Sequence, residues 1–128
     1  MSWRKGLIGI LSVALFIEVL WPILGFLMPG TLLTAFKIAP TPDVNFLVFV
    51  LAWCLLFIAV ICGWALRLVL KNDAFGWTLS YILGLWWVGI GGSLFLLYDH
   101  LDNLFLDGLK GAIICVCAWQ SRASIKSR

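Results

Sequence analysis

The chain has 128 residues, of which 63% are hydrophobic and only 12% are charged, and its formal net charge is +3. Soluble globular domains are about half apolar and about one quarter charged, so this composition excludes a soluble domain and indicates an integral membrane protein. The small positive charge is typical of membrane topology and of attraction to anionic lipid headgroups, and it does not indicate nucleic-acid binding.

Four apolar segments approach or exceed the roughly 20 residues that are needed to cross a hydrocarbon core about 30 Å thick. They lie at residues 7–28, 45–66, 75–98 and 104–119. The first segment follows Arg4 and Lys5, as a signal peptide would. It is longer than an h-region of about 7–15 residues and lacks a small-residue cleavage site, so we predict that it is retained. The sequence therefore predicts an all-α fold, a four-helix transmembrane bundle, in a single domain of residues 1–128.

The distribution of basic residues predicts the orientation of this bundle. Seven of the nine Lys and Arg residues fall at segment ends that share one side of the membrane, and only Lys37 and Lys110 lie toward the other. Because cytoplasmic loops hold the excess of Lys and Arg, we predict cytoplasmic N- and C-termini. A plasma membrane or a bacterial inner membrane fits this orientation.

The first segment contains the stretch FIEVLWP, in which Glu18 is followed four residues later by Pro22. At about 1.5 Å per residue, Glu18 lies about 18 Å from the inner end, slightly past the midplane. A charge at this depth costs about 2.5 kcal/mol or more, so it faces protein or water and indicates a functional site. Pro22 has no N–H to donate to the backbone carbonyl of Glu18. The side-chain carboxyl group of Glu18 and this unpaired carbonyl oxygen are therefore expected at the same depth in the membrane. Glu18 could be a neutral hydrogen-bonded packing group, a partner of Lys110, or a proton- or ligand-binding group.

Residues 31–38, TLLTAFKI, follow the first segment and are too apolar for a solvated loop. We predict a short helix along the membrane interface that stops at Pro40 and Pro42.

Small residues on the later segments favour close helix packing, as is usual in membranes. Ser80, Gly84, Trp87 and Gly91 share one face of the third segment. The predicted packing glycines are Gly84, Gly89, Gly91, Gly92, Gly108 and Gly111. The alternative is that WWVGIGG leaves space for a ligand beside two indoles. The candidate ligand- or proton-binding residues at the level of Glu18 are Glu18 itself, Trp53, Trp86, Trp87 and Lys110.

Polar residues follow the third segment in YDHLDNLFLDGLKG. An outer polar cluster of Asp99, His100, Asp102 and Asp107 could bind a divalent ion or serve acid–base chemistry. Solvated helix ends and helix caps are the simpler interpretation, because acids favour helix starts. The spacing matches no established metal motif. We therefore assign no metal, no cofactor and no catalytic residue.

The four cysteines are Cys54, Cys62, Cys115 and Cys117. Cys62 and either Cys115 or Cys117 are expected at a similar depth in the membrane, which would allow a redox pair. Two thiols at a C-x-C spacing point apart on a helix, and buried Cys behaves as a small hydrophobe, so we predict a packing role.

The second half of the chain, LGLWWVGIGGSLF and then DNLFLDGLKGAII, resembles the last two helices of small four-helix membrane proteins of the BphX-like and DoxX-like kind. The shared features are a Trp-Gly helix, a short acidic connection and a D-x-x-K-G pattern, here Asp107, Lys110 and Gly111. This resemblance implies the same bundle and no defined chemistry. The stretch FIEVL is also similar to the first helix of small multidrug resistance transporters, which carry an essential membrane-embedded Glu. Only Glu18 is carried over from that family, because the long apolar first loop, Pro22 and the strong charge bias depart from it.

We consider three functional hypotheses, in this order. The first is a small polytopic, non-enzymatic accessory or scaffold component that binds lipid or a partner subunit, either another membrane protein or a second copy. The second is a proton-coupled carrier of a hydrophobic or cationic small molecule that uses Glu18. The third is a membrane enzyme that acts on a lipid or quinone at the outer face through His100 and the aspartates.

Overall fold

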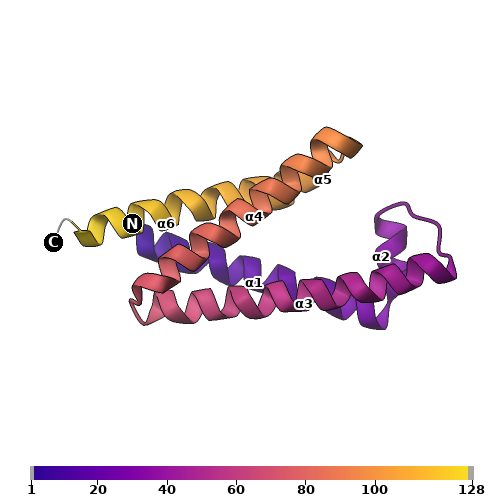
Figure 1. The fold of residues 1–128 in the computed structure, drawn as a ribbon, viewed down its shortest axis with the longest axis horizontal. Coiled ribbons are helices and arrows are strands. Elements are labelled where there is room, and N and C mark those ends of the chain that lie inside the picture. The colour runs from indigo at the N-terminus through magenta and orange to yellow at the C-terminus, as the bar shows by residue number, and fades with distance from the viewer. Residues whose placement is uncertain (1, 127–128) are drawn as a thin grey trace. The chain divides into compact units, whose positions relative to one another are not determined.

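A computed structural model describes residues 2–126 of the chain, and this part contains helices and no strands (Figure 1). The elements are α1 (Trp3–Leu27), α2 (Pro29–Ala35), α3 (Pro42–Leu70), α4 (Ala74–Tyr98), α5 (Leu101–Asn103), the π-helix η1 (Leu104–Leu109) and α6 (Lys110–Lys126). The prediction of an all-α fold is confirmed for the described residues. The helices α1 and α3 extend several residues beyond the segments expected from hydropathy.

Within the described residues, three helices are long and apolar enough to cross a membrane, namely α1, α3 and α4. They contain 25, 29 and 25 residues, more than the roughly 20 that a bilayer requires. The predicted membrane character is therefore confirmed at this level. The fourth predicted segment is helical but is divided between η1 and a 17-residue α6 that begins with a charged residue, Lys110. A fourth membrane span stays a prediction.

The chain divides into two compact units. Unit 1 consists of Met1–Ala14 and Cys62–Arg128, and unit 2 consists of Leu15–Ile61. The helices α1 and α3 each contribute one part to each unit.

Unit 2 is organised around α2, which covers most of the apolar segment expected at the membrane interface. Its hydrophobic cluster consists of Leu32, Leu33, Val48, Trp21 and Val44. The rings of Trp21 and Phe36 lie 6.0 Å apart between centroids. Pro42 begins α3 instead of only ending the preceding segment, because proline is well suited to the first turn of a helix.

Three segments of unit 1 meet at one end of that unit. The guanidinium of Arg4 donates to the carbonyl oxygens of Val69 at 3.4 Å and Leu70 at 3.0 Å, at the end of α3. On the other side of α1, Gly6 faces α6, where a Cβ atom on Gly6 would lie 3.6 Å from Cys117 Sγ. The first turns of α1, the connection between α3 and α4, and the second half of α6 therefore lie together (Figure 1).

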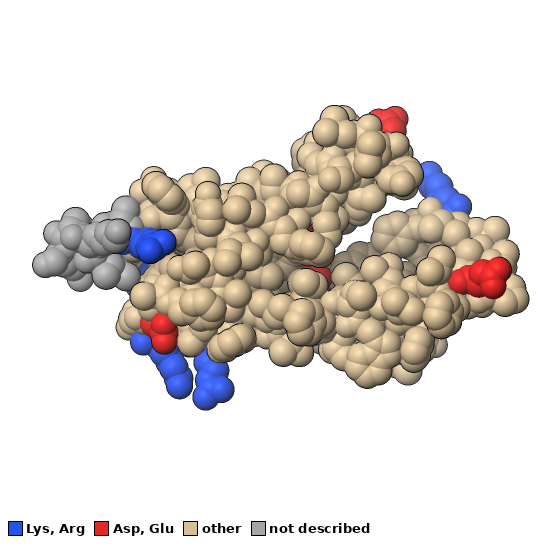
Figure 2. Space-filling view, viewed as in Figure 1, with Lys and Arg blue, Asp and Glu red and all other residues tan. Residues whose placement is uncertain are grey.

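Basic side chains gather at this end of unit 1. Figure 2 shows Lys and Arg side chains there in blue. Those that belong to the three segments are Arg4, Lys5, Arg67, Lys71 and Arg122. Basic residues that are far apart in the sequence therefore lie at the same end of unit 1.

The helix α4 packs against η1 and α6 through glycines that allow the backbones to touch. A Cβ atom on Gly84 would lie 2.8 Å from the carbonyl oxygen of Gly111, and one on Gly91 would lie 2.5 Å from the backbone nitrogen of Gly108. Real Cβ atoms do not approach other atoms so closely, so any side chain at these positions would separate the helices. We call Gly84, Gly91, Gly108 and Gly111 the packed glycines.

The two other predicted packing glycines, Gly89 and Gly92, lie on a different face of α4. A Cβ atom on either of them would meet no other atom within 4 Å. We call this pair the open-face glycines, because nothing in the described chain fills the space that their missing side chains leave.

The two groups of glycines predict opposite effects of the same substitution. We expect Gly84→Ala to destabilise the protein by about 1–3 kcal/mol, because the added methyl group overlaps the backbone of α6. Gly89→Ala should instead be neutral or stabilise the protein by about 0.5–1 kcal/mol, because alanine favours the helix and the space is open. Unfolding in detergent, followed by circular dichroism, measures both variants; equal unfolding midpoints would contradict the assigned packing.

Candidate functional site

The side chain of Lys110, at the start of α6, is buried although it carries a charge. It is only 7% exposed. Its Nζ lies 3.0 Å from Asp107 Oδ1 and 4.4 Å from the centroid of the Trp87 ring, which is itself buried. A cation over an indole face is stabilised by about 2 kcal/mol when water is excluded. We call Asp107, Lys110 and Trp87 the Lys110 cluster.

Local backbone structure assembles this cluster. Asp107 lies in η1 and Lys110 is the first residue of α6, so the pair has an i, i+3 spacing across the junction. The neighbouring Gly111 has no side chain, and a Cβ atom there would lie 2.9 Å from the Cβ of Trp87. The missing side chain therefore lets the indole approach α6 beside the ammonium group. Single π-helical turns within longer helices occur frequently at functional sites.

The electrostatics of the cluster make it a candidate site. Removing one partner of a buried ion pair is strongly destabilising, because it leaves the other charge uncompensated. Trp87 belongs to α4, one of the three helices long and apolar enough to cross a membrane, so the cluster adjoins a candidate membrane span. The cluster combines an acid, a cation and an aromatic face at the junction of two helical segments.

Glu18, the other ionisable candidate, belongs to the part of α1 that lies in unit 2. It is 3% exposed, and Pro22, one turn later, is fully buried. The helix continues through Pro22 to Leu27. The predicted Glu18–Lys110 pair joins residues of different units and stays a prediction.

The two other tryptophans predicted at this level lie at the surface. Trp53 is 57% exposed and packs edge-on against Phe26, with 5.4 Å between ring centroids. Trp86 is 50% exposed, on the side of α4 that carries the open-face glycines. Of the five predicted ligand- or proton-binding residues, the structure brings Trp87 and Lys110 together.

The outer polar cluster is divided among several roles. Asp99 caps the C-terminus of α4 in a left-handed conformation, with φ of 56°. His100 precedes α5, Asp102 lies within it, and all three of these side chains are exposed. Asp107 instead pairs with Lys110. Within the described residues, no group of three or more His, Cys, Asp and Glu side chains is arranged to hold a metal ion.

The four cysteines are free thiols. Two of them contact a neighbouring helix, since Cys62 Sγ donates to the carbonyl of Leu11 and Cys115 Sγ to that of Tyr81, both at 3.7 Å. These contacts are consistent with a packing role.

Two features of the structure were missed in the sequence. The first is a close contact in unit 2, where a Cβ atom on Gly25 would lie 2.8 Å from the Cβ of Ala52. A lone glycine seven residues after Glu18 could have indicated this close helix contact in the sequence. The second is a groove of about 530 Å³ along α4, which we call the α4 groove. It is lined by Leu85, Trp86, Gly89, Ile90, Ser93 and Leu94.

The chain matches no sequence model of a known protein family, and no curated protein or solved structure is significantly similar to it. Function is therefore inferred from the geometry of its own residues.

The Lys110 cluster predicts energetic coupling between its charged members. We expect Asp107→Asn to destabilise the protein by about 1–3 kcal/mol, less than for a fully buried pair because Asp107 is partly exposed. Lys110→Met should cost more, because Lys110 contacts both Asp107 and Trp87. A double-mutant cycle measured by unfolding in detergent should give a coupling energy of about 0.5–3 kcal/mol. Additive effects of the two substitutions would show that the pair contributes nothing.

Proposed function

We propose that this protein is a non-enzymatic, multi-pass membrane component that binds a partner transmembrane helix along the α4 groove. The observation that carries this proposal is the difference between the two groups of glycines on α4. On α4, the packed glycines Gly84 and Gly91 already lie against α6 and η1, whereas the open-face glycines, Gly89 and Gly92, contact nothing in the described chain.

The physical cost of the open-face glycines supports this proposal. A glycine inside a helix costs about 1 kcal/mol relative to alanine, and lipid tails return none of that cost. A partner helix can offset this cost by van der Waals contact, because small residues let two backbones approach closely in a membrane. The other small residue that lines the groove beside Gly89 is Ser93, which donates its hydroxyl to the carbonyl of Gly89 at 2.6 Å. The groove therefore offers close backbone contact without a charged group.

We further propose a fourth span that includes η1 and α6, with both termini cytoplasmic, in a plasma membrane or a bacterial inner membrane. The support comes from unit 1, where the first turns of α1, the α3–α4 connection and the basic residues share one end. Four crossings return the chain to its starting side, and basic residues favour the cytoplasm. The resemblance to BphX-like and DoxX-like proteins supports the same architecture.

This proposal predicts a specific protein contact at the α4 groove. A photo-reactive phenylalanine analogue at Trp86 should form a protein adduct of defined mass in native membranes. The same analogue at Trp64, an exposed position on α3, should react with lipid. We expect Gly89→Leu to abolish the protein adduct, since its side chain fills the groove.

The matched control for this experiment is Gly9→Leu. Gly9 also has open space around its Cβ position but lies on α1, so the adduct at position 86 should survive. Lipid adducts alone at position 86, or a protein adduct unaffected by Gly89→Leu, would contradict the proposed interface.

A second candidate function is a proton-coupled carrier of a hydrophobic cation. The observation that favours it is the burial of Glu18, a carboxyl group at 3% exposure inside a membrane helix. The enzyme hypothesis gains no such support, because Asp99, His100 and Asp102 are exposed and, among the residues that the structure describes, belong to no group of ligating side chains.

Binding of tetraphenylphosphonium tests the carrier hypothesis. If Glu18 exchanges protons for the cation, binding by the wild-type protein in liposomes should weaken as the pH falls, and Glu18→Gln should remove this dependence. Asp43→Asn, which changes an exposed acid of α3, should behave as the wild type. A wild-type protein that binds no tetraphenylphosphonium at any pH would argue against the carrier.

A further inference from the structure

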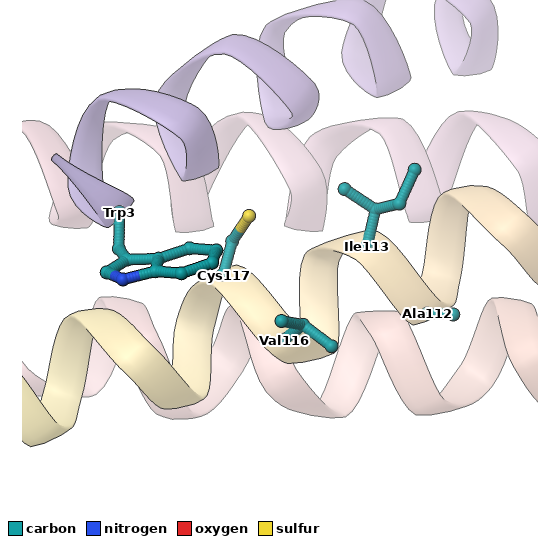
Figure 3. Close-up of a pocket in the computed structure, with 5 residues that line it drawn as sticks. All are labelled: Trp3, Ala112, Ile113, Val116 and Cys117. Carbon is teal, nitrogen blue, oxygen red and sulfur yellow. The ribbon is translucent and has the colours of Figure 1, made fainter. Parts of the chain in front are cut away.

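A second groove lies in unit 1, beside the N-terminal turn of α1 and away from α4. Figure 3 shows the indole of Trp3 next to Cys117, with the other lining residues further along α6. The groove has a volume of about 330 Å³ and is lined by Trp3, Ala112, Ile113, Val116 and Cys117. We call it the α1–α6 groove. At 1.5 Å per residue, its floor on α6 is about 7.5 Å long.

The chemistry of the groove is apolar along its length. Ala112, Ile113 and Val116 are all exposed, so the groove opens sideways toward the bilayer. A linear hydrocarbon chain fits an open apolar channel of this kind better than a compact polar ligand does. Trp3, also exposed, lies at the end where the chain enters the membrane. Tryptophan at such a position is typical of the headgroup level.

The charges around that end are strongly one-sided. The three segments that meet there carry Arg4, Lys5, Arg67, Lys71 and Arg122, against the acid Asp73 within their described residues. Two of these groups are already engaged, since Arg4 donates to carbonyls of α3 and the carboxylate of Asp73 accepts from the backbone N–H of Phe75. Lys5 and Arg122 are exposed and can attract an anionic headgroup at the membrane surface.

We infer that the α1–α6 groove binds an anionic phospholipid. One acyl chain lies along residues 112–117, and the phosphate is held at the basic end of unit 1, level with Trp3. Any exposed helix in a bilayer touches lipid; the groove and the excess of positive charge are what select an anionic lipid here. This inference rests on the proposed fourth span, because α6 must face the bilayer, but it uses no residue of the α4 groove and does not depend on the proposed partner helix.

Native mass spectrometry tests this inference directly. The purified protein is given equal amounts of phosphatidylglycerol and phosphatidylcholine in detergent, and the retained lipids are counted. We expect the wild type to retain one phosphatidylglycerol in preference to phosphatidylcholine. Ala112→Phe fills the groove at an exposed position and should abolish retention. Ala74→Phe makes the same change at an exposed position of α4 outside the groove and should leave retention unchanged.

A second variant separates the charge from the groove. In the double variant Lys5→Gln, Arg122→Gln, the preference for phosphatidylglycerol should fall about fivefold for each charge removed, while the groove itself is intact. Equal retention of the two lipids by the wild type would overturn the inference. Unchanged retention by Ala112→Phe would overturn it as well, since the bound lipid would then lie elsewhere.

Discussion

Unit 1 depends on direct backbone contact between α4 and the helical segment that follows it. Gly84 lies against Gly111, and Gly91 lies against Gly108. Small residues let two backbones approach closely and associate by van der Waals packing. The absence of side chains at Gly84, Gly91 and Gly111 supplies that closeness, since a Cβ atom at each would lie within 3 Å of the facing segment. It also sets how the next residues meet, because the indole of Trp87 reaches α6 only where Gly111 leaves room.

The close approach of α4 and α6 also buries the charged side chain of Lys110. Lys110 would be costly as an isolated buried cation, but Asp107 compensates its charge and the face of Trp87 covers it. A buried pair of this kind need not stabilise the fold relative to well-packed apolar residues. We propose that it instead favours the observed alignment of α4 with η1 and α6, because in that alignment the three groups lie together.

Much of this architecture is predictable from local sequence patterns. Hydropathy alone identifies α1, α3 and α4, because a membrane span is a property of composition over about 20 residues. Helical periodicity places Ser80, Gly84, Trp87 and Gly91 on one face of α4, and the structure buries all four. The i, i+3 spacing of Asp107 and Lys110 likewise indicates a local pair. These features require no knowledge of distant contacts.

Other features depend on tertiary contacts or on backbone geometry that leaves no residue signature. The π-helix η1 interrupts the predicted fourth span. Its one residue of low helix propensity, Gly108, was interpreted as a packing residue, and a single glycine does not distinguish a π-helix from an α-helix. Helical periodicity separates Gly91 from Gly89, but the sequence does not show which face of α4 meets another segment; the contact of Gly91 with Gly108 does. Trp53 and Trp87 were both predicted as ligand- or proton-binding residues at the level of Glu18, and only tertiary contacts distinguish them. Trp53 packs against Phe26 at the surface of the protein, and Trp87 covers a cation.

The most direct test of the proposed role is the assembly state of the protein in its own membrane. Native mass spectrometry after gentle extraction records every co-purifying mass and the number of copies of this chain. The proposed role predicts a second polypeptide in stoichiometric amount, either another membrane protein or a second copy, which is lost in Gly89→Leu and kept in Gly9→Leu. A single copy of the chain that carries only lipid would contradict it.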